Sequence, residues 1–83
     1  MKILYFAWLR ERLNRGEEDV TPPPEVATVA DLLDWLGARD EAAAFAFADR
    51  KAIRAAVDEE IVPLDTALAG AATVALFPPM TGG

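Results

Sequence analysis

A dense run of strand-forming residues, Ile-Leu-Tyr-Phe, lies between Lys2 and Ala7 near the start of the chain. Because successive side chains of a strand point to opposite faces, this run places apolar groups on both faces of a strand at 2–7. We expect both faces to be covered by other parts of the chain. With 83 residues, that cover has to come from one small domain with a thin core.

The spacing of apolar residues changes after this strand and predicts a short helix. Leu9 and Leu13 stand four residues apart, arginines follow toward the C-terminal end, and Gly16 is placed to cap the helix. The polar segment 17–21 is a weak strand candidate. The three prolines at 22–24 must end it, because proline has no N–H to offer a sheet, and they predict an exposed extended connection.

Two helix starts are marked in the middle of the chain. Thr28 with Asp31 three residues later resembles a capping box. The apolar residues that follow share one helical face and, with Leu9 and Leu13, are predicted to line the core: Val29, Leu32, Leu33 and Leu36. Asp40 is placed to cap a short or irregular alanine-rich helix over 41–48. The two phenylalanines of that segment are two residues apart, so they cannot share one helical face.

The last third of the chain has the pattern of a hairpin and a final strand. Residues 53–57 and 61–62 are the two arms of the hairpin, and the acidic triplet 58–60 is its predicted turn. Three adjacent carboxylates also suggest a metal site, but no spaced set of ligands accompanies them, so the turn is preferred. Pro63 shortens the second arm, and 73–77 is the last strand. The order of elements predicts an α+β domain with a mixed sheet of four to five strands and helices packed on one face.

The composition excludes several classes of function. There is no cysteine and no histidine, which rules out disulfides, thiolate nucleophiles, imidazole bases and Cys/His zinc sites; no metal site is expected. Fourteen acidic against eight basic residues give a net charge of −6, which disfavours nucleic acid and anionic membranes as partners. The first apolar run is too short for a signal peptide, and no run reaches the roughly 20 residues of a membrane span, so a cytoplasmic location is expected.

The C-terminal residues have the properties of a tail that enters a partner. Pro78 and Pro79 stiffen its base, and six extended residues reach about 20 Å. Gly82 and Gly83 remove all side chains from its tip, so that a main-chain carboxylate can enter a narrow channel. Two terminal glycines alone also fit an ordinary frayed end. The sequence predicts that the reactive group of this protein is its own C-terminus.

The tail and the first strand together resemble a known family. The sequence Leu-Phe-Pro-Pro-x-Thr-Gly-Gly at 76–83 and the segment Lys-Ile-Leu-Tyr-Phe-Ala at 2–7 are similar to the small subunit of molybdopterin synthase, a ubiquitin-like sulfur carrier of molybdenum cofactor biosynthesis. The segments 28–32, 56–58 and 61–62 support the resemblance, which covers nearly the whole chain.

This resemblance implies a β-grasp domain at 1–77 and a flexible tail at 78–83. It implies that an adenylyltransferase of the ubiquitin-activating type uses ATP and Mg²⁺ to adenylylate Gly83, which becomes a thiocarboxylate, while this chain binds no cofactor. The tail would then enter the large synthase subunit, in a heterotetramer, and give sulfur to cyclic pyranopterin phosphate to form the dithiolene of molybdopterin. The implied contacts to the large subunit are Phe6, Ile61, Phe77, Pro78, Pro79, Met80 and Thr81. On this reading the chain is a sulfur donor without catalytic side chains.

Two departures and two alternatives accompany the resemblance. Met80 stands where the family has a β-branched residue, and the turn at 70–73 lacks the usual Gly-Asp, which leaves its geometry open. One alternative is a β-grasp sulfur carrier of another pathway, such as thiamine thiazole formation or tRNA thiolation. The other is a non-catalytic ubiquitin-like binding module whose tail is inert.

Overall fold

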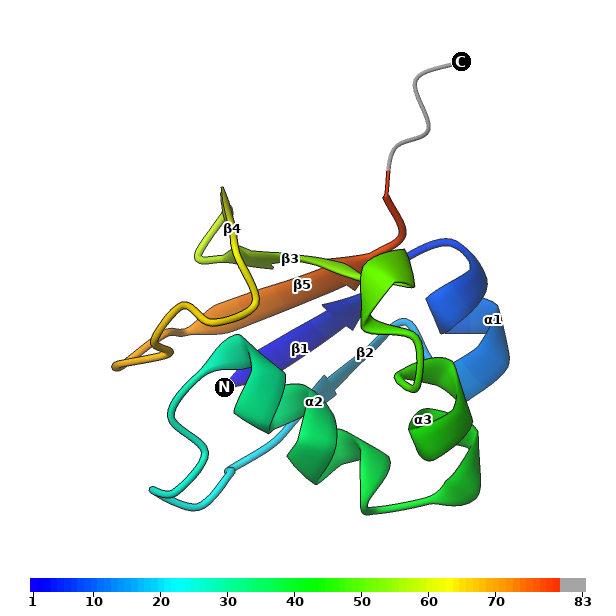
Figure 1. Ribbon diagram of the computed structural model, residues 1–83, viewed down its shortest axis with the longest axis horizontal. Helices are drawn as coiled ribbons and strands as arrows, with labels where there is room; N and C mark the ends of the chain where they lie inside the picture. The colour runs from blue at the N-terminus through cyan, green and yellow to red at the C-terminus, as the bar shows by residue number, and fades with distance from the viewer. Residues whose placement is uncertain (80–83) are drawn as a thin grey trace.

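The computed structural model describes residues 1–79 as five strands, three α-helices and one 3₁₀ turn (Figure 1). The elements in chain order are β1 (Lys2–Tyr5), α1 (Trp8–Leu13), β2 (Glu17–Asp19), α2 (Val29–Gly37), α3 (Glu41–Ala46), the 3₁₀ turn (Arg50–Ala52), β3 (Arg54–Val57), β4 (Glu60–Val62) and β5 (Thr73–Phe77). No helix within these 79 residues is long and apolar enough to cross a membrane.

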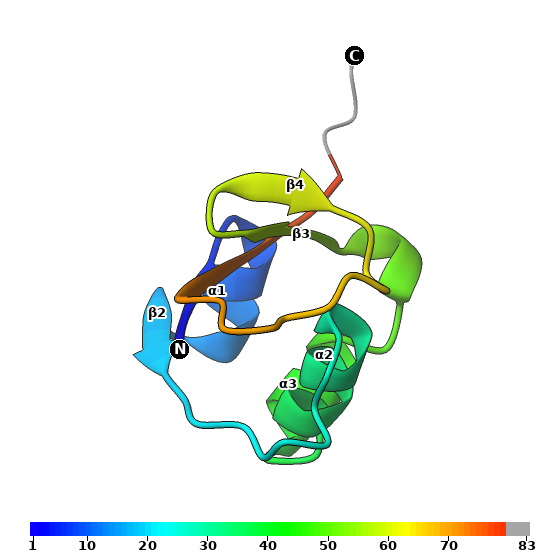
Figure 2. The same ribbon diagram turned by 90° about the vertical axis from the view of Figure 1, so that its left-hand side faces the viewer.

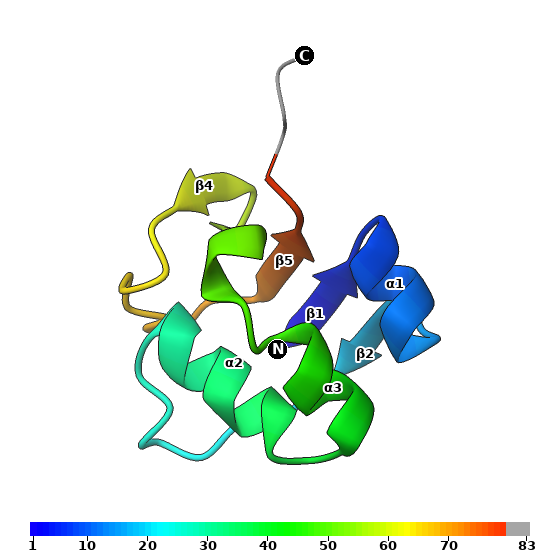
Figure 3. The same cartoon turned by 45° about the vertical axis from the view of Figure 1, so that its right-hand side comes forward.

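The five strands form one mixed sheet in the order β2-β1-β5-β3-β4. The two central strands β1 and β5 are parallel, although they come from opposite ends of the chain, and the other pairs are antiparallel. α2 and α3 lie against one face of the sheet, and α1 packs beside α3 (Figures 2 and 3). This architecture confirms the predicted α+β class, the mixed sheet and the helices on one face.

The core lies between the helices and the inner face of the sheet. Tyr5 stacks on Phe47 there, with ring centroids 6.4 Å apart. The six residues predicted to line this core are all buried: Leu9, Leu13, Val29, Leu32, Leu33 and Leu36. Burial of these side chains holds α1 and α2 against the rest of the core, and Ala43 and Ala46 are buried from α3. Helices of six to nine residues need such packing because they are not stable alone.

Both predicted helix starts are confirmed. The Thr28 hydroxyl accepts a hydrogen bond from the backbone N–H of Asp31 at 3.1 Å, and the Asp31 carboxylate accepts one from the N–H of Thr28 at 3.1 Å. The Asp40 carboxylate caps α3 through the N–H of Ala43 at 2.8 Å. These bonds satisfy donors that have no partner inside the helix.

Two local predictions are wrong in detail. α1 ends at Leu13, and its left-handed cap is Asn14 with φ of 55°, where Gly16 was expected. Asparagine tolerates this conformation, while the carbonyl of Gly16 accepts a hydrogen bond from Tyr5 N–H at 2.9 Å. In the hairpin, Asp58 and Glu59 both have positive φ and form a two-residue turn, so the third acidic residue belongs to β4.

The expectation that both faces of the first strand are covered is also wrong. Ile3 and Tyr5 point inward and are buried, whereas Leu4 points to the opposite face and is half-buried. The burial pattern of β5 alternates in the same way. Within residues 1–79, no helix packs over this second face of the sheet (Figure 2). The apolar residues on this second face are therefore not part of the core between the sheet and the helices.

Candidate functional site

The sheet face opposite to the helices carries a patch of apolar side chains. Leu4 pairs with Ala75, Ala75 with Ala56, and Ala56 with Ile61, so these four residues form one row across the sheet. Cross-strand partners point to the same face. We call this surface the outer sheet face, and it consists of Leu4, Phe6, Arg54, Ala56, Ile61, Ala75 and Phe77.

A second row of the outer sheet face lies toward the end of β5. Phe77 pairs with Arg54 of β3. The alternation of β1 continues to Phe6, whose N–H donates to the carbonyl of Leu76 at 3.1 Å. Phe6 therefore lies on the same side as Phe77, at the base of the C-terminal segment. The parallel pairing of β1 with β5 brings these two aromatic residues together from positions 71 apart in the sequence.

The outer sheet face has more exposed apolar area than folding requires. Ile61 is 71% exposed and Phe6 is 48% exposed, while Phe77 is half-buried. Ile61 lies on an edge strand, so it is accessible from the side as well as from above. Contiguous exposed apolar residues of this kind are typical of a surface that binds another protein.

The structure brings together three of the residues singled out in the sequence and the beginning of the tail. Phe6, Ile61 and Phe77 share the outer sheet face, and Pro78 and Pro79 continue from Phe77 as half-buried residues. The remaining predicted tail residues lie outside the described residues: Met80, Thr81, Gly82 and Gly83.

Sequence reasoning missed the other members of this surface. Leu4 was assigned to a strand covered on both sides, and Ala56 and Ala75 were only parts of strands. Arg54 was counted within a hairpin arm and given no role. The alternation of burial along each strand is the signal that places them, but it needs the strand order to show which alternate residues face the helices.

A cluster of charged and polar groups joins the inner side of β2 to the helices. The Tyr5 hydroxyl donates to Glu18 Oε2 at 2.6 Å, and Glu18 Oε1 accepts from Arg39 at 2.7 Å and from Arg15 at 3.2 Å. Burial raises the pKa of Tyr5, and its hydrogen bond to Glu18 adds to the shift. Burial opposes ionisation of Glu18, but the hydrogen bonds from Arg39 and Tyr5 outweigh it, so the pKa of Glu18 is lowered. Every side chain of this cluster is hydrogen-bonded to another member, and we interpret the cluster as one that stabilises the fold.

The acidic hairpin turn also has a structural role. Asp58 Oδ1 accepts hydrogen bonds from the N–H groups of Ala72 and Thr73 at 3.0 and 2.9 Å. These bonds, with Gly70 at a φ of 77°, define the turn before β5 whose geometry the sequence left open. Within residues 1–79, no group of three or more acidic side chains is placed to hold a metal ion.

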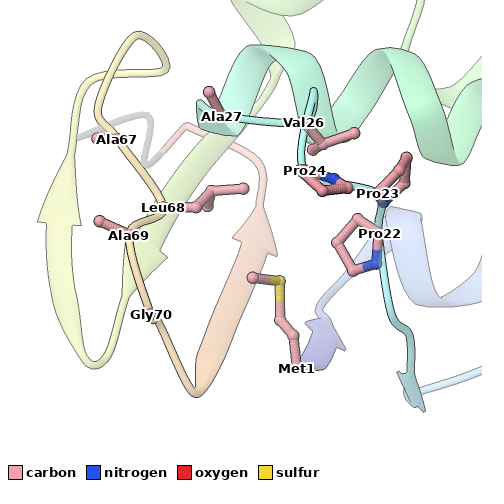
Figure 4. A pocket seen from close by; sticks show the side chains of 10 residues that line it. All are labelled: Met1, Pro22, Pro23, Pro24, Val26, Ala27, Ala67, Leu68, Ala69 and Gly70. Atoms are coloured by element: carbon pink, nitrogen blue, oxygen red, sulfur yellow. The ribbon is translucent and has the colours of Figure 1, made fainter.

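A cavity of about 480 Å³ lies near the N-terminus and the loop before β5 (Figure 4). The three prolines line it, together with Met1, Val26 and Leu68, and of the three Pro24 is exposed as expected, while Pro22 and Pro23 are half-buried. Figure 4 shows their side chains around a common space, with none that can donate or accept a proton. The side chains that line this cavity therefore offer no group for acid–base catalysis.

Comparison with known protein sequences gives relatives that span the whole chain. A family model described as the ThiS family matches residues 3–83. The molybdopterin synthase sulfur carrier subunit of Escherichia coli (strain K12) is 35% identical over 83 residues, which is 100% of this chain and 99% of the relative.

Solved structures agree with the sequence relatives. SAMP1 from Haloferax volcanii superimposes with a TM-score of 0.74 at 31% identity, over 99% of this chain and 97% of that one. A structure assigned as molybdopterin converting factor, subunit 1, from Pyrococcus furiosus gives a TM-score of 0.72 at 30% identity, over 95% of each chain. These similarities confirm the ubiquitin-like β-grasp fold. With a family model that covers residues 3–83 and a full-length relative at 35% identity, the chain belongs to the ThiS family.

Proposed function

We propose that this protein is the sulfur carrier subunit of a molybdopterin synthase. The observation that carries the proposal is the full-length similarity to the Escherichia coli sulfur carrier subunit. The exposed apolar surface at the base of the C-terminal segment supports it, because a carrier has to bind a partner while its tail reaches into that partner.

The proposed chemistry takes place at the carboxylate of Gly83. A carboxylate oxygen attacks the α-phosphorus of ATP, pyrophosphate leaves, and an acyl-adenylate forms on an adenylyltransferase of the ubiquitin-activating type, which supplies ATP and Mg²⁺. A sulfur nucleophile then displaces AMP and leaves a thiocarboxylate. The thiocarboxylate sulfur bonds to a carbon of cyclic pyranopterin phosphate in place of an oxygen substituent, and water then cleaves the acyl–sulfur bond and returns the carboxylate of Gly83. Two such transfers supply the two sulfurs of the dithiolene. This domain contributes no acid, base or metal ligand to these steps.

The domain itself binds the partner protein and places the tail so that it reaches into that partner. The outer sheet face binds the large subunit of the synthase, with Phe6, Ile61 and Phe77 as the apolar contacts. Residues 78–83 then extend into the large subunit, where Gly82 leaves room for the backbone in a narrow channel. Two small and two large subunits make up the proposed complex, which works in the cytoplasm.

The test of this function is the intact mass of the protein purified from its own host. A fraction whose mass corresponds to exchange of one C-terminal oxygen for sulfur is expected, and the same measurement determines whether Gly83 is the last residue. A variant that lacks Gly83 is the control. It should fold normally and form no thiocarboxylate, because the reach is shortened by about 3.5 Å. A Gly83 deletion that still forms thiocarboxylate and dithiolene product at the parent rate would overturn the proposal.

A carrier for another sulfur pathway remains the second candidate, because the family model that matches the chain is not specific to molybdopterin. An assay with the protein that carries the thiocarboxylate distinguishes the two functions. We expect this protein to form dithiolene product with the large synthase subunit and the pyranopterin precursor. Sulfur transfer only into a thiazole precursor or into tRNA would favour the second candidate, and an inert module would form no acyl-adenylate at all.

A further inference from the structure

Arg54 is a charged residue at the rim of the outer sheet face, at the end of the row that contains Phe6 and Phe77. It is exposed, and it is the cross-strand partner of Phe77, the residue before the tail prolines. In the neighbouring row toward the hairpin, Leu4, Ala75 and Ala56 are apolar, and the charged Glu17 lies at the β2 edge, where it pairs with Lys2. A partner that covers Phe77 therefore also lies next to Arg54.

The guanidinium of Arg54 is held in place without a carboxylate. Its Nη1 donates to the carbonyl oxygens of Ile53 at 3.1 Å and Lys51 at 3.3 Å. None of the ion pairs found within residues 1–79 involves Arg54. A positioned guanidinium with unused N–H groups matches the two oxygens of a carboxylate.

The charges around the outer sheet face are separated along β3. Lys51 and Arg54 lie at the tail end of β3 and take part in none of the ion pairs within residues 1–79, whereas Arg50 binds Asp34 and the carbonyl of Ala30 on the helix side. The acidic residues 58–60 lie at the opposite end, about 13 Å further along the strand. In segment 49–54 the two basic residues outside the ion pairs, Lys51 and Arg54, thus outnumber the one acidic residue, Asp49, in a chain whose net charge is −6.

We propose that Arg54 receives a carboxylate of the protein that binds the outer sheet face, and that this ion pair orients the partner toward the tail. The inference rests on the function proposed above and names the chemistry of the partner's surface. An exposed charge at the rim of an interface acts mainly on the rate and direction of association. An acidic residue of the partner beside the tail channel would attract Arg54 and be repelled by the acidic hairpin turn, which fixes one of two orientations along β3.

The experiment measures association of this protein with the purified large subunit of its molybdopterin synthase at low salt. Arg54→Glu is compared with Arg12→Glu, which makes the same change of charge on α1, where Arg12 lies over the rings of Trp8 and Phe45. Both variants lower the net charge by two, so general electrostatics are matched. We expect Arg54→Glu to slow association about tenfold or more, and Arg12→Glu to change it much less. Arg54→Lys should restore most of the rate, and Arg54→Met should reduce its dependence on salt.

Ile61→Asp separates failure of this inference from failure of the proposed function. If Ile61→Asp abolishes binding while the two arginine variants associate equally fast, the outer sheet face binds the large subunit and the role of Arg54 is wrong. If the unmodified protein does not bind the large subunit, the proposed function fails and this inference fails with it. Equal melting temperatures for all variants are required, because Arg54 also donates to two backbone carbonyls.

Discussion

The two faces of the sheet are built from the same strands, but only one of them is covered by helices. On β5, Val74 and Leu76 are completely buried beneath the helices, while Ala75 and Phe77 on the other side are half-exposed. These four residues of β5 are all apolar, so their composition does not show which side is covered. What differs is that helices pack on one face, and burial on that face supplies most of the hydrophobic free energy of folding. The apolar residues on the outer face remain available to a partner.

The two phenylalanines of the α3 segment give the sharpest version of this comparison. Phe47 is 1% exposed and stacks on Tyr5, whereas Phe45 is 74% exposed. We expect Phe47→Ala to lower the free energy of unfolding by about 3–5 kcal/mol, a large part of the total for a small domain. The matched control Phe45→Ala should change it by less than about 1 kcal/mol. Urea unfolding followed by circular dichroism measures both, and equal losses would mean that the core is assigned incorrectly.

The outer face should respond in the opposite way to a charged substitution. Ile61→Asp is expected to weaken binding to the large subunit by about 2 kcal/mol or more, because an apolar contact of the proposed interface is replaced by a charge that must be desolvated. The same variant should keep the parent's melting temperature, since Ile61 is 71% exposed. Calorimetric titration measures the loss of binding, and thermal unfolding measures the melting temperature. Loss of the folded state in Ile61→Asp would place this residue in the core and remove it from the binding surface.

The capping box of α2 tests how the inner face keeps its helix. Thr28→Ala removes the hydroxyl that accepts from Asp31 N–H, and we expect a loss of about 1 kcal/mol of unfolding free energy. Thr28→Ser keeps the acceptor and is the control, with a much smaller loss. If both variants unfold at the same denaturant concentration as the parent, then α2 is held by its buried leucines without help from the cap.

The smallest expected effect concerns pH and contrasts two neighbouring glutamates of β2. Glu18 points inward and its pKa is lowered from the ordinary 4.5, so it stabilises the fold above that pH. This contribution should be lost as the pH falls below about 4.5, through the folded-state pKa, because protonation removes the charge that Arg39 and Tyr5 bind. Glu18→Gln should therefore flatten the acid side of the stability curve.

Glu17 is the control for this measurement, because its ion pair with Lys2 at 3.1 Å is exposed on the other face. Glu17→Gln should leave the shape of the curve close to that of the parent. Thermal unfolding at a series of pH values compares the two variants. If Glu17→Gln flattens the acid side as much as Glu18→Gln does, the inward cluster contributes nothing specific.

The local features of this protein follow from short sequence patterns. Thr28 with Asp31 and Asp40 mark the helix starts, because each supplies an acceptor for N–H groups that lie within three residues. The positions of the leucines predict the buried helix faces, because the helical period is fixed by backbone geometry. The end of the α1 helix was missed, because both Asn14 and Gly16 can adopt a left-handed conformation and local sequence does not choose between them.

Only the tertiary structure decided which face of each strand is covered. The pattern of β1 is apolar on both sides, and the helices, which are distant in sequence, select Ile3 and Tyr5 and leave Leu4 and Phe6 outside. The outer sheet face depends on the parallel pairing of β1 with β5, which come from opposite ends of the sequence. Such pairing is set by the global packing of helices on the sheet, because many registers satisfy the same local pattern. That is why the sequence alone determined the helices and strands, and the fold determined that Phe6, Arg54 and Phe77 lie side by side.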